Sequence, residues 1–175
     1  MITLKFAAID PGPHQSAATP WEVHYQQPVS LGSFLLPTEE FIDKLDSILP
    51  DIQLLVIEAV INYGHPLDLN ARNTILNSGR FHQLSKMRKC PVIYVPYSDV
   101  GVHFCKQRHA KQSAINVALV AKFGYGNVIE AKGSKKNPAI FYGVESHIWS
   151  SAALAMYISE NINEFGMSFL DKYKI

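Results

Sequence analysis

Short apolar runs alternate with longer amphipathic stretches along this chain. Residues 2–9 and 53–60 are dominated by apolar side chains, as expected of strands buried on both faces of a sheet. In residues 21–27, apolar and polar side chains alternate, which predicts a strand with one buried face and one wet face. A further strand is expected at residues 29–36, and another buried strand at residues 91–96.

Helical patterns fill the intervals between these strands. Residues 37–50 begin with Pro37 and Thr38 and carry acids in the first turn, while Pro50 ends the segment. The order of elements is typical of an α/β fold, in which helices flank a mixed sheet. No linker divides residues 1–175, so we expect a single domain. Further helices are expected at about residues 66–88, 97–105, 110–123 and 144–162, with a lysine-rich loop at 131–143.

Composition narrows the class of protein. The 175 residues are 47% hydrophobic and 18% charged, with a net charge of +1, so a basic surface must be local rather than global. The two cysteines, Cys90 and Cys105, lack CxxC spacing, which argues against a thiolate zinc site and a disulfide framework. This pattern suits a reducing cytosol, so we expect a cytoplasmic protein. The sequence has no signal-peptide run and no apolar stretch of membrane-spanning length, so no membrane partner is expected.

Two acids stand at or near the ends of apolar runs. Asp10 follows the first run and precedes Pro11 and Gly12, which end the strand, and turn initiation alone would explain it. Glu58 interrupts "LLVIEAV", where an unpaired carboxylate is costly to bury, and a salt bridge to a basic side chain is its simplest explanation. If the two strands are neighbours, Asp10 and Glu58 meet and repel each other unless a cation lies between them. Mg²⁺ takes oxygen ligands of this kind.

His147 opens a third candidate segment, "SHIWSSAALAMYI". On a helix, it shares one stripe with Ser151 and Leu154, and the small residues allow close approach to a sheet. In the first turn of that helix, His147 could reach a site at the strand ends. A lone histidine in a helix is more often structural, so the candidacy of His147 depends on Asp10 and Glu58.

Four motifs in order carry a resemblance to a known family. They are "IDPG", "VIEAV", the lysine in "HAKQSAINVALVAKFG" and the helix "SHIWSSAALA". Together they resemble the RuvC type of Holliday-junction resolvase, within the RNase H-like nuclease superfamily, over about residues 5–158. The segment "GSKKNPAIFYGVESHIWSSAALA" looks closest to compact versions carried by bacteriophages. The resemblance implies an RNase H-like mixed sheet flanked by helices, and a homodimer that nicks four-way DNA junctions symmetrically.

The resemblance also implies roles for named residues. Asp10, Glu58 and His147 would be catalytic ligands of two divalent ions, Mg²⁺ or Mn²⁺, and an imidazole ligand suits Mn²⁺ better. Lys111 matches a catalytic lysine near the scissile phosphate. Many members carry an aspartate three residues after the histidine, where this chain has Ser150, a poor metal ligand. Either Asp10, Glu58, His147 and waters suffice, or activity is lost.

Basic clusters in the middle and late chain are candidates for DNA binding. Neutralisation of phosphates by such clusters supplies most sequence-independent affinity, although a solvated surface would explain each cluster alone. The candidate contacts are Lys106, Arg108, Lys111, Lys135 and Lys136.

The segment after Glu58 carries two further candidates. In the family this region approaches the junction centre, where Tyr63 could stack on a base, and loop packing is the alternative. Gly79 in mid-helix costs about 1 kcal/mol relative to alanine, and close helix contact across a two-fold axis would explain it. Arg80 would then contact phosphate or stabilise this interface.

Three other functions fit parts of the pattern. A junction-binding protein that lost catalysis would explain Ser150, and another RNase H-like nuclease would share the acids. An actin-like sugar kinase or ATPase shares the "D-x-G" turn after the first strand. That class needs further phosphate-binding glycine loops, which the sequence does not show.

Overall fold

The computed structural model describes residues 3–24, 27–61, 64, 66–124 and 126–173. Its centre is a mixed sheet with strand order β3-β2-β1-β5-β6, and β4 pairs with β2 outside this path. Strand β1 is antiparallel to β2 and parallel to β5, which is parallel to β6. The strands are β1 (Leu4–Asp10), β2 (Gln15–His24), β3 (Gln27–Ser30), β4 (Phe34–Pro37), β5 (Leu54–Ala59) and β6 (Val92–Pro96).

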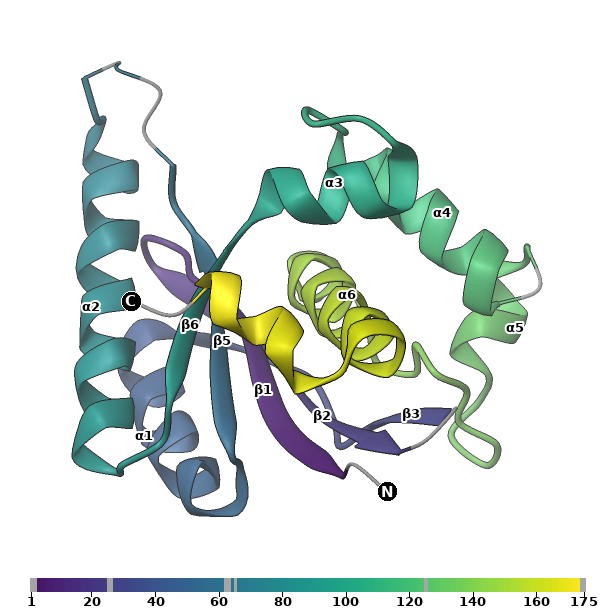
Figure 1. The fold of residues 1–175 in the computed structure, drawn as a ribbon, viewed down its shortest axis with the longest axis horizontal. Coiled ribbons are helices and arrows are strands. Elements are labelled where there is room, and N and C mark those ends of the chain that lie inside the picture. The colour runs from purple at the N-terminus through teal and green to yellow at the C-terminus, as the bar shows by residue number, and fades with distance from the viewer. Residues whose placement is uncertain (1–2, 25–26, 62–63, 65, 125, 174–175) are drawn as a thin grey trace.

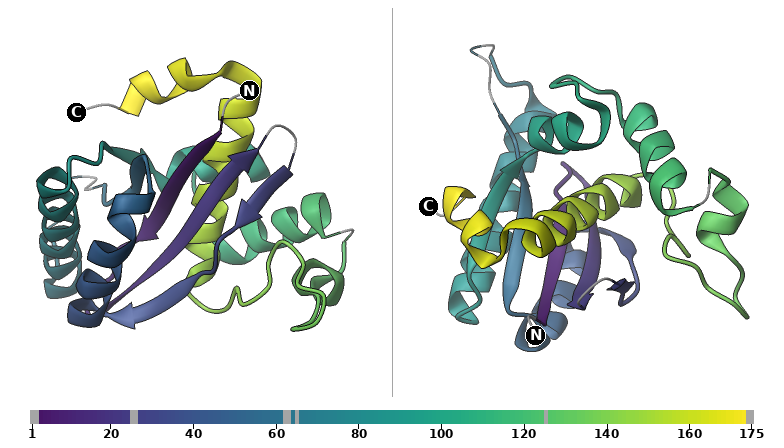
Figure 2. Two further views of the ribbon diagram at one scale, coloured as in Figure 1. Left: turned by 90° about the horizontal axis from the view of Figure 1, so that it is seen from below. Right: turned by 45° about the vertical axis from the view of Figure 1, so that its right-hand side comes forward.

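Helices cover both faces of this sheet. Helices α1 and α2 lie on one face, whereas α6 crosses the other face and packs against α3 and α4 (Figures 1 and 2). The expected α/β architecture, a mixed sheet flanked by helices, is therefore confirmed. The helices are α1 (Thr38–Ile48), α2 (Leu69–Met87), α3 (Tyr97–Cys105), α4 (Gln112–Phe123), α5 (Val128–Lys132) and α6 (Ile148–Phe165), with short 3₁₀ segments η1 (Leu49–Asp51) and η2 (Met167–Tyr173).

The two central strands separate two apolar cores. Side chains alternate between the faces of a strand. Phe6 and Val56 pack in the core on the α6 side, whereas Ile9 and Ile57 pack with Phe81 of α2 on the other side. Burial on both faces explains why the sequence of β1 and β5 is a continuous apolar run.

The region after β1 differs from the expected strand pattern in two places. The strand expected at 21–27 begins at Gln15, because pairing with β1 and β4 extends a stretch of small residues that has little strand propensity. Its expected buried face is confirmed at Trp21 and Val23, while residues 25–26 lie outside the described residues. The strand expected at 29–36 is wrong as one element, since Gly32 has a φ of +97° and separates β3 from β4.

Two later expectations also need correction. Strand β6 is at the edge of the path and half-buried: Ile93 and Val95 are buried, but Tyr94 between them is partly exposed. Helix α6 begins at Ile148 rather than near residue 144, so His147 caps this helix instead of lying in its first turn. No helix among the described residues is long and apolar enough to cross a bilayer.

Candidate active site

Strands β1, β5 and β6 run parallel, so their carboxyl ends meet at one edge of the sheet, the usual place for a site in such sheets. Ile9 pairs with Ile57, and Asp10 and Glu58 are the next residues of the two strands. Because side chains alternate between the two faces of a strand, Asp10 and Glu58 lie on the same face as Phe6 and Val56, which is the face covered by α6. The two strands that carry the acids are therefore neighbours in the sheet, which is the condition for Asp10 and Glu58 to meet.

The two acids are half-buried, and their carboxyl groups influence each other. Burial raises the pKa of Asp10 to about 6, although the neighbouring Ser150 hydroxyl and the charge of His147 act in the opposite direction. Burial, and then the negative charge of Asp10, hold the pKa of Glu58 well above its ordinary value. Glu58 Oε2 is buried and has no hydrogen-bond partner among the described residues, so a salt bridge does not account for this acid.

A hydroxyl–amide network lies beside the acids. Ser150 Oγ donates to Gln112 Oε1 at 2.8 Å, and the Tyr97 hydroxyl donates to the same oxygen. Gln112 Nε2 in turn donates to Asn116 Oδ1 at 2.6 Å. Burial and the charges of Glu58 and Asp10 raise the pKa of Tyr97, which places its phenol near both acids. Sequence reasoning missed Tyr97 and Gln112, although Tyr97 directly follows the end of β6.

His147 and Asp10 line one open pocket of about 440 Å³, together with His14 and the turn after β1. His147 is exposed at the start of α6, and its charge acts on Asp10. Among the described residues, no group of three or more His, Cys, Asp or Glu side chains forms a ready metal site. The role of His147 as a third ligand therefore stays a prediction.

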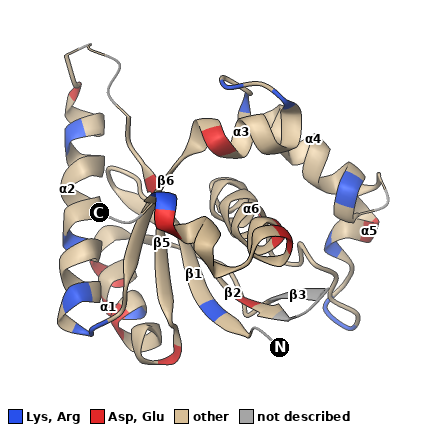
Figure 3. Cartoon of the chain, viewed as in Figure 1, with Lys and Arg blue, Asp and Glu red and all other residues tan. Residues whose placement is uncertain are grey.

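The basic candidates lie on the surface near this edge and beyond it. Lys111 occupies the N-cap position of α4, directly before Gln112, which contacts Ser150, and its role near the scissile phosphate stays a prediction. Figure 3 shows lysine and arginine along the α3–α4 connection and around α5. Their contacts with DNA remain predictions. The exposed candidates are Lys106, Arg108, Lys111, Lys135 and Lys136.

The sequence also predicts DNA contacts by Arg80, which lies on α2, and by Tyr63, which precedes this helix in the sequence. The guanidinium of Arg80 forms a two-pronged ion pair with Glu39 of α1, at 2.8 and 2.7 Å. Arg80 therefore ties α1 to α2 within one chain, and its contact with phosphate or a partner stays a prediction. Tyr63 lies outside the described residues.

Comparison with solved structures identifies the fold. RuvC of Thermus thermophilus superposes with a TM-score of 0.63 at 14% identity, over 92% of this chain and 96% of RuvC. The same protein in complex with a Holliday junction substrate gives 0.64 at 12% identity, over 93% and 97%. Fowlpox virus resolvase in complex with Holliday junction DNA gives 0.50 at 14% identity, over 91% and 99%. No protein-family model and no curated protein matches the sequence. The RNase H-like fold is thus confirmed.

Proposed function

We propose that this protein is a divalent-metal-dependent endonuclease that cleaves branched DNA, with the four-way junction as its principal substrate. The observation that carries this proposal is the half-buried pair of Asp10 and Glu58, in which the buried Glu58 Oε2 has no hydrogen-bond partner among the described residues. Unpartnered buried polar atoms are rare, and two buried carboxylates repel each other. A hard divalent cation between them would satisfy both groups.

The donor set fits Mg²⁺ or Mn²⁺. Asp10 and Glu58 would hold the metal, with His147 as the third ligand and a second ion expected in the same site. When bound, the metal would neutralise charge on the phosphate and lower the pKa of a water molecule. Imidazole favours Mn²⁺, so cleavage with Mn²⁺ should be at least as fast as with Mg²⁺. Lys111 and the exposed basic residues beside it would hold the phosphates of the DNA.

The substrate class is inferred from the fold neighbours. Thermus thermophilus RuvC and fowlpox virus resolvase were both solved with Holliday junction DNA, and each aligns with more than 90% of this chain. The site also lies on an open pocket rather than in a closed cavity, as a macromolecular substrate requires. These observations favour branched DNA over a small phosphate ester.

A homodimer would supply the two active sites that symmetric nicking needs. Nothing lies within 4 Å of a Cβ placed on Gly79 of α2, so packing within the chain does not require a glycine there. The helix also exposes Leu76 by 66% and Met87 by 69%. A second α2 against this face would bury these side chains and use the close approach that Gly79 permits. Leu76→Glu should convert a dimer to monomers in light scattering.

The test of the proposal is cleavage of a labelled four-way junction. The wild-type protein should introduce paired symmetric nicks in Mn²⁺ or Mg²⁺ and none in EDTA. Asp10→Asn should bind the junction with unchanged affinity and cut at least about 100-fold more slowly, because it removes a metal ligand. Retained cutting by this variant would contradict the assignment of Asp10.

A second function, junction binding without catalysis, is favoured by one observation. Ser150 occupies the position of the expected third acid and donates its proton to Gln112 rather than offering a carboxylate. Tight junction binding with no cutting in either metal would support this alternative. Linear duplex of the same sequence is the control for structure-selective binding.

A further inference from the structure

The turn that follows Asp10 has a fixed backbone. The amide of Gly12 donates to Ser16 Oγ at 3.2 Å, which closes the turn on the start of β2. A Cβ placed on Gly12 would lie 2.1 Å from the carbonyl oxygen of Gln15. This close approach requires glycine, so the turn is packed against itself.

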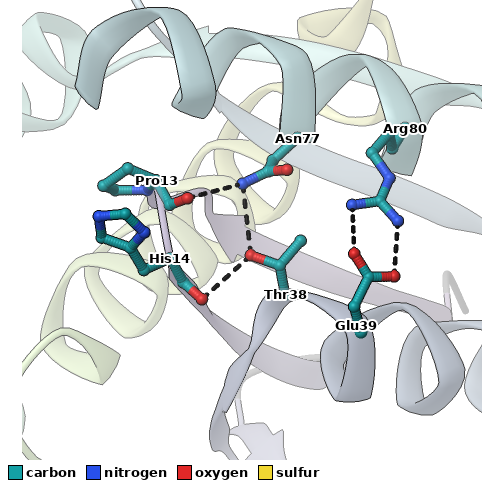
Figure 4. Close-up of polar contacts among 6 residues, drawn as sticks. All are labelled: Pro13, His14, Thr38, Glu39, Asn77 and Arg80. Carbon is teal, nitrogen blue, oxygen red and sulfur yellow. Dashed lines mark hydrogen bonds and ion pairs between the residues drawn. The ribbon is translucent and has the colours of Figure 1, made fainter. Parts of the chain in front are cut away.

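Side chains from α1 and α2 hold the same turn from outside (Figure 4). Asn77 of α2 is buried, and its Nδ2 donates to the carbonyl oxygen of Gly12 at 2.9 Å and lies 3.4 Å from that of Pro13. The amide and hydroxyl of Thr38 donate to the carbonyl oxygen of His14 at 3.0 and 3.1 Å. Asn77 Nδ2 also lies 3.3 Å from Thr38 Oγ1. A buried amide and a helix start therefore fix the backbone of three consecutive residues.

The side chain of His14 is left exposed by this arrangement. Figure 4 shows its imidazole pointing away from Thr38, which holds the His14 backbone, and from Asn77, which holds the two residues before it. In the described part of the chain, no hydrogen bond to the imidazole occurs. The ring lines the pocket that also contains Asp10 and His147. An imidazole with an N–H donor is thus exposed in the pocket that Asp10 lines.

An exposed imidazole in this pocket suits a phosphate oxygen of the substrate. His14 lines the pocket beside Asp10 and His147, and its own backbone carbonyl oxygen already accepts from Thr38. An imidazole N–H donates well to an anionic oxygen, and such bonds are about twice as strong as neutral ones. Because the backbone is already fixed, only the side-chain torsions of His14 must be ordered when the donor binds.

We propose that His14 donates a hydrogen bond to a phosphate oxygen of the DNA strand that is cut, and that Asn77 and Thr38 are positioning residues for it. This inference rests on the proposed function and adds to it a phosphate contact from the turn that follows Asp10. Through Asn77, the turn beside Asp10 is held by α2, the helix whose outer face is proposed to form the dimer interface.

The first experiment is single-turnover cleavage of a four-way junction at saturating protein. His14→Ala and His14→Phe should each cut about 10- to 100-fold more slowly, with the junction Kd raised only about two- to threefold. His14→Lys restores a donor and should recover most of the rate. His82→Phe, at the opposite end of the sheet, removes a remote imidazole and should cut as the wild type does. Wild-type rates for His14→Phe would overturn the proposal.

The second experiment identifies the partner atom. Single phosphates around the crossover are replaced in turn by neutral methylphosphonates, and binding and cutting are measured for the wild type and His14→Ala. One replacement should weaken the wild type and have no further effect in His14→Ala, as expected of a directly coupled pair. If the effects of methylphosphonate replacement and of His14→Ala are independent at every phosphate tested, the proposed contact is wrong. A fall in Mn²⁺ affinity of His14→Ala, measured by calorimetry, would instead make His14 a ligand and overturn the proposal.

The two proposals can fail separately. If the wild type cuts and His14→Phe cuts equally well, the inference on His14 is wrong and the proposed function stands. If the wild type binds junctions without cutting, nuclease activity is wrong. The methylphosphonate cycle on binding alone then still supports or contradicts the His14 contact. Asn77→Ala should slow cutting in the wild type but add nothing to His14→Ala, whereas additive losses would contradict the positioning role.

Discussion

Neutralising Asp10 should stabilise the metal-free protein at neutral and alkaline pH. Burial raises the pKa of Asp10 from 3.8 to about 6, so the fold favours the protonated carboxyl. The stabilising contribution is complete below pH 3.8 and is lost as the pH rises through about 6. At pH 8 the metal-free wild type must therefore hold an ionised, half-buried Asp10 beside Glu58.

The size of the effect follows from this shift in pKa. Each unit corresponds to about 1.4 kcal/mol, so ionisation of Asp10 costs the folded state up to about 3 kcal/mol. Asparagine has nearly the same shape and carries no charge, but it changes the contact with Ser150. We expect Asp10→Asn to raise the free energy of unfolding by about 1–3 kcal/mol at pH 8 in EDTA, with the gain disappearing near pH 4.

Urea unfolding at several pH values, in EDTA and in Mn²⁺, measures this difference. Asp43→Asn, on the exposed surface of α1, is the matched control and should leave stability unchanged at every pH. Adding Mn²⁺ should stabilise the wild type through binding to the folded state and reverse the order of the two proteins. If Asp10→Asn is less stable than the wild type at pH 8 in EDTA, the reasoning about the buried pair is wrong.

Three further predictions concern the site and its support. Ser150→Asp adds a carboxylate beside Asp10 and should raise Mg²⁺ affinity at least about tenfold in calorimetry; unchanged affinity would mean that Ser150 lies outside the metal shell. Gly12→Ala forces a methyl group against the carbonyl of Gln15 and should destabilise the protein by about 1–3 kcal/mol in urea unfolding, whereas a neutral effect would contradict the tight turn. Interactions with two basic partners lower the pKa of Glu160 despite its partial burial, so Glu160→Gln should cost about 1 kcal/mol at pH 7. That cost should shrink as the pH falls below 4.5, and a cost that is constant with pH would argue against ionic support.

The acid pair could be predicted from the sequence because it depends on two simple patterns. Continuous apolar runs indicate central strands, and a carboxylate in or after such a run is conspicuous. Parallel pairing of β1 with β5 then brings Asp10 and Glu58 together without any further information. The hydroxyl–amide network beside the acids could not be predicted in this way, because Tyr97 and Gln112 meet Ser150 only through the packing of α3 and α4 against α6.

The errors in element boundaries have local physical causes. The first half of β2 consists of small residues and a proline, and partner strands rather than propensity make it extended. The start of α6 follows Ser146, whose φ of +43° interrupts the backbone before the helix. The exposed position of His14 was also hidden from the sequence, because Thr38, which anchors its backbone, lies 24 residues away, and Asn77, which anchors Gly12, lies 65 residues from that glycine.

The most direct test of the central claim is a crystal structure of the protein soaked in Mn²⁺, with anomalous difference density to locate the ions. We expect a peak within coordination distance of the carboxylate oxygens of both Asp10 and Glu58, lost in Asp10→Asn crystals treated in the same way. Anomalous density elsewhere on the protein with none between these two carboxylates would contradict the account.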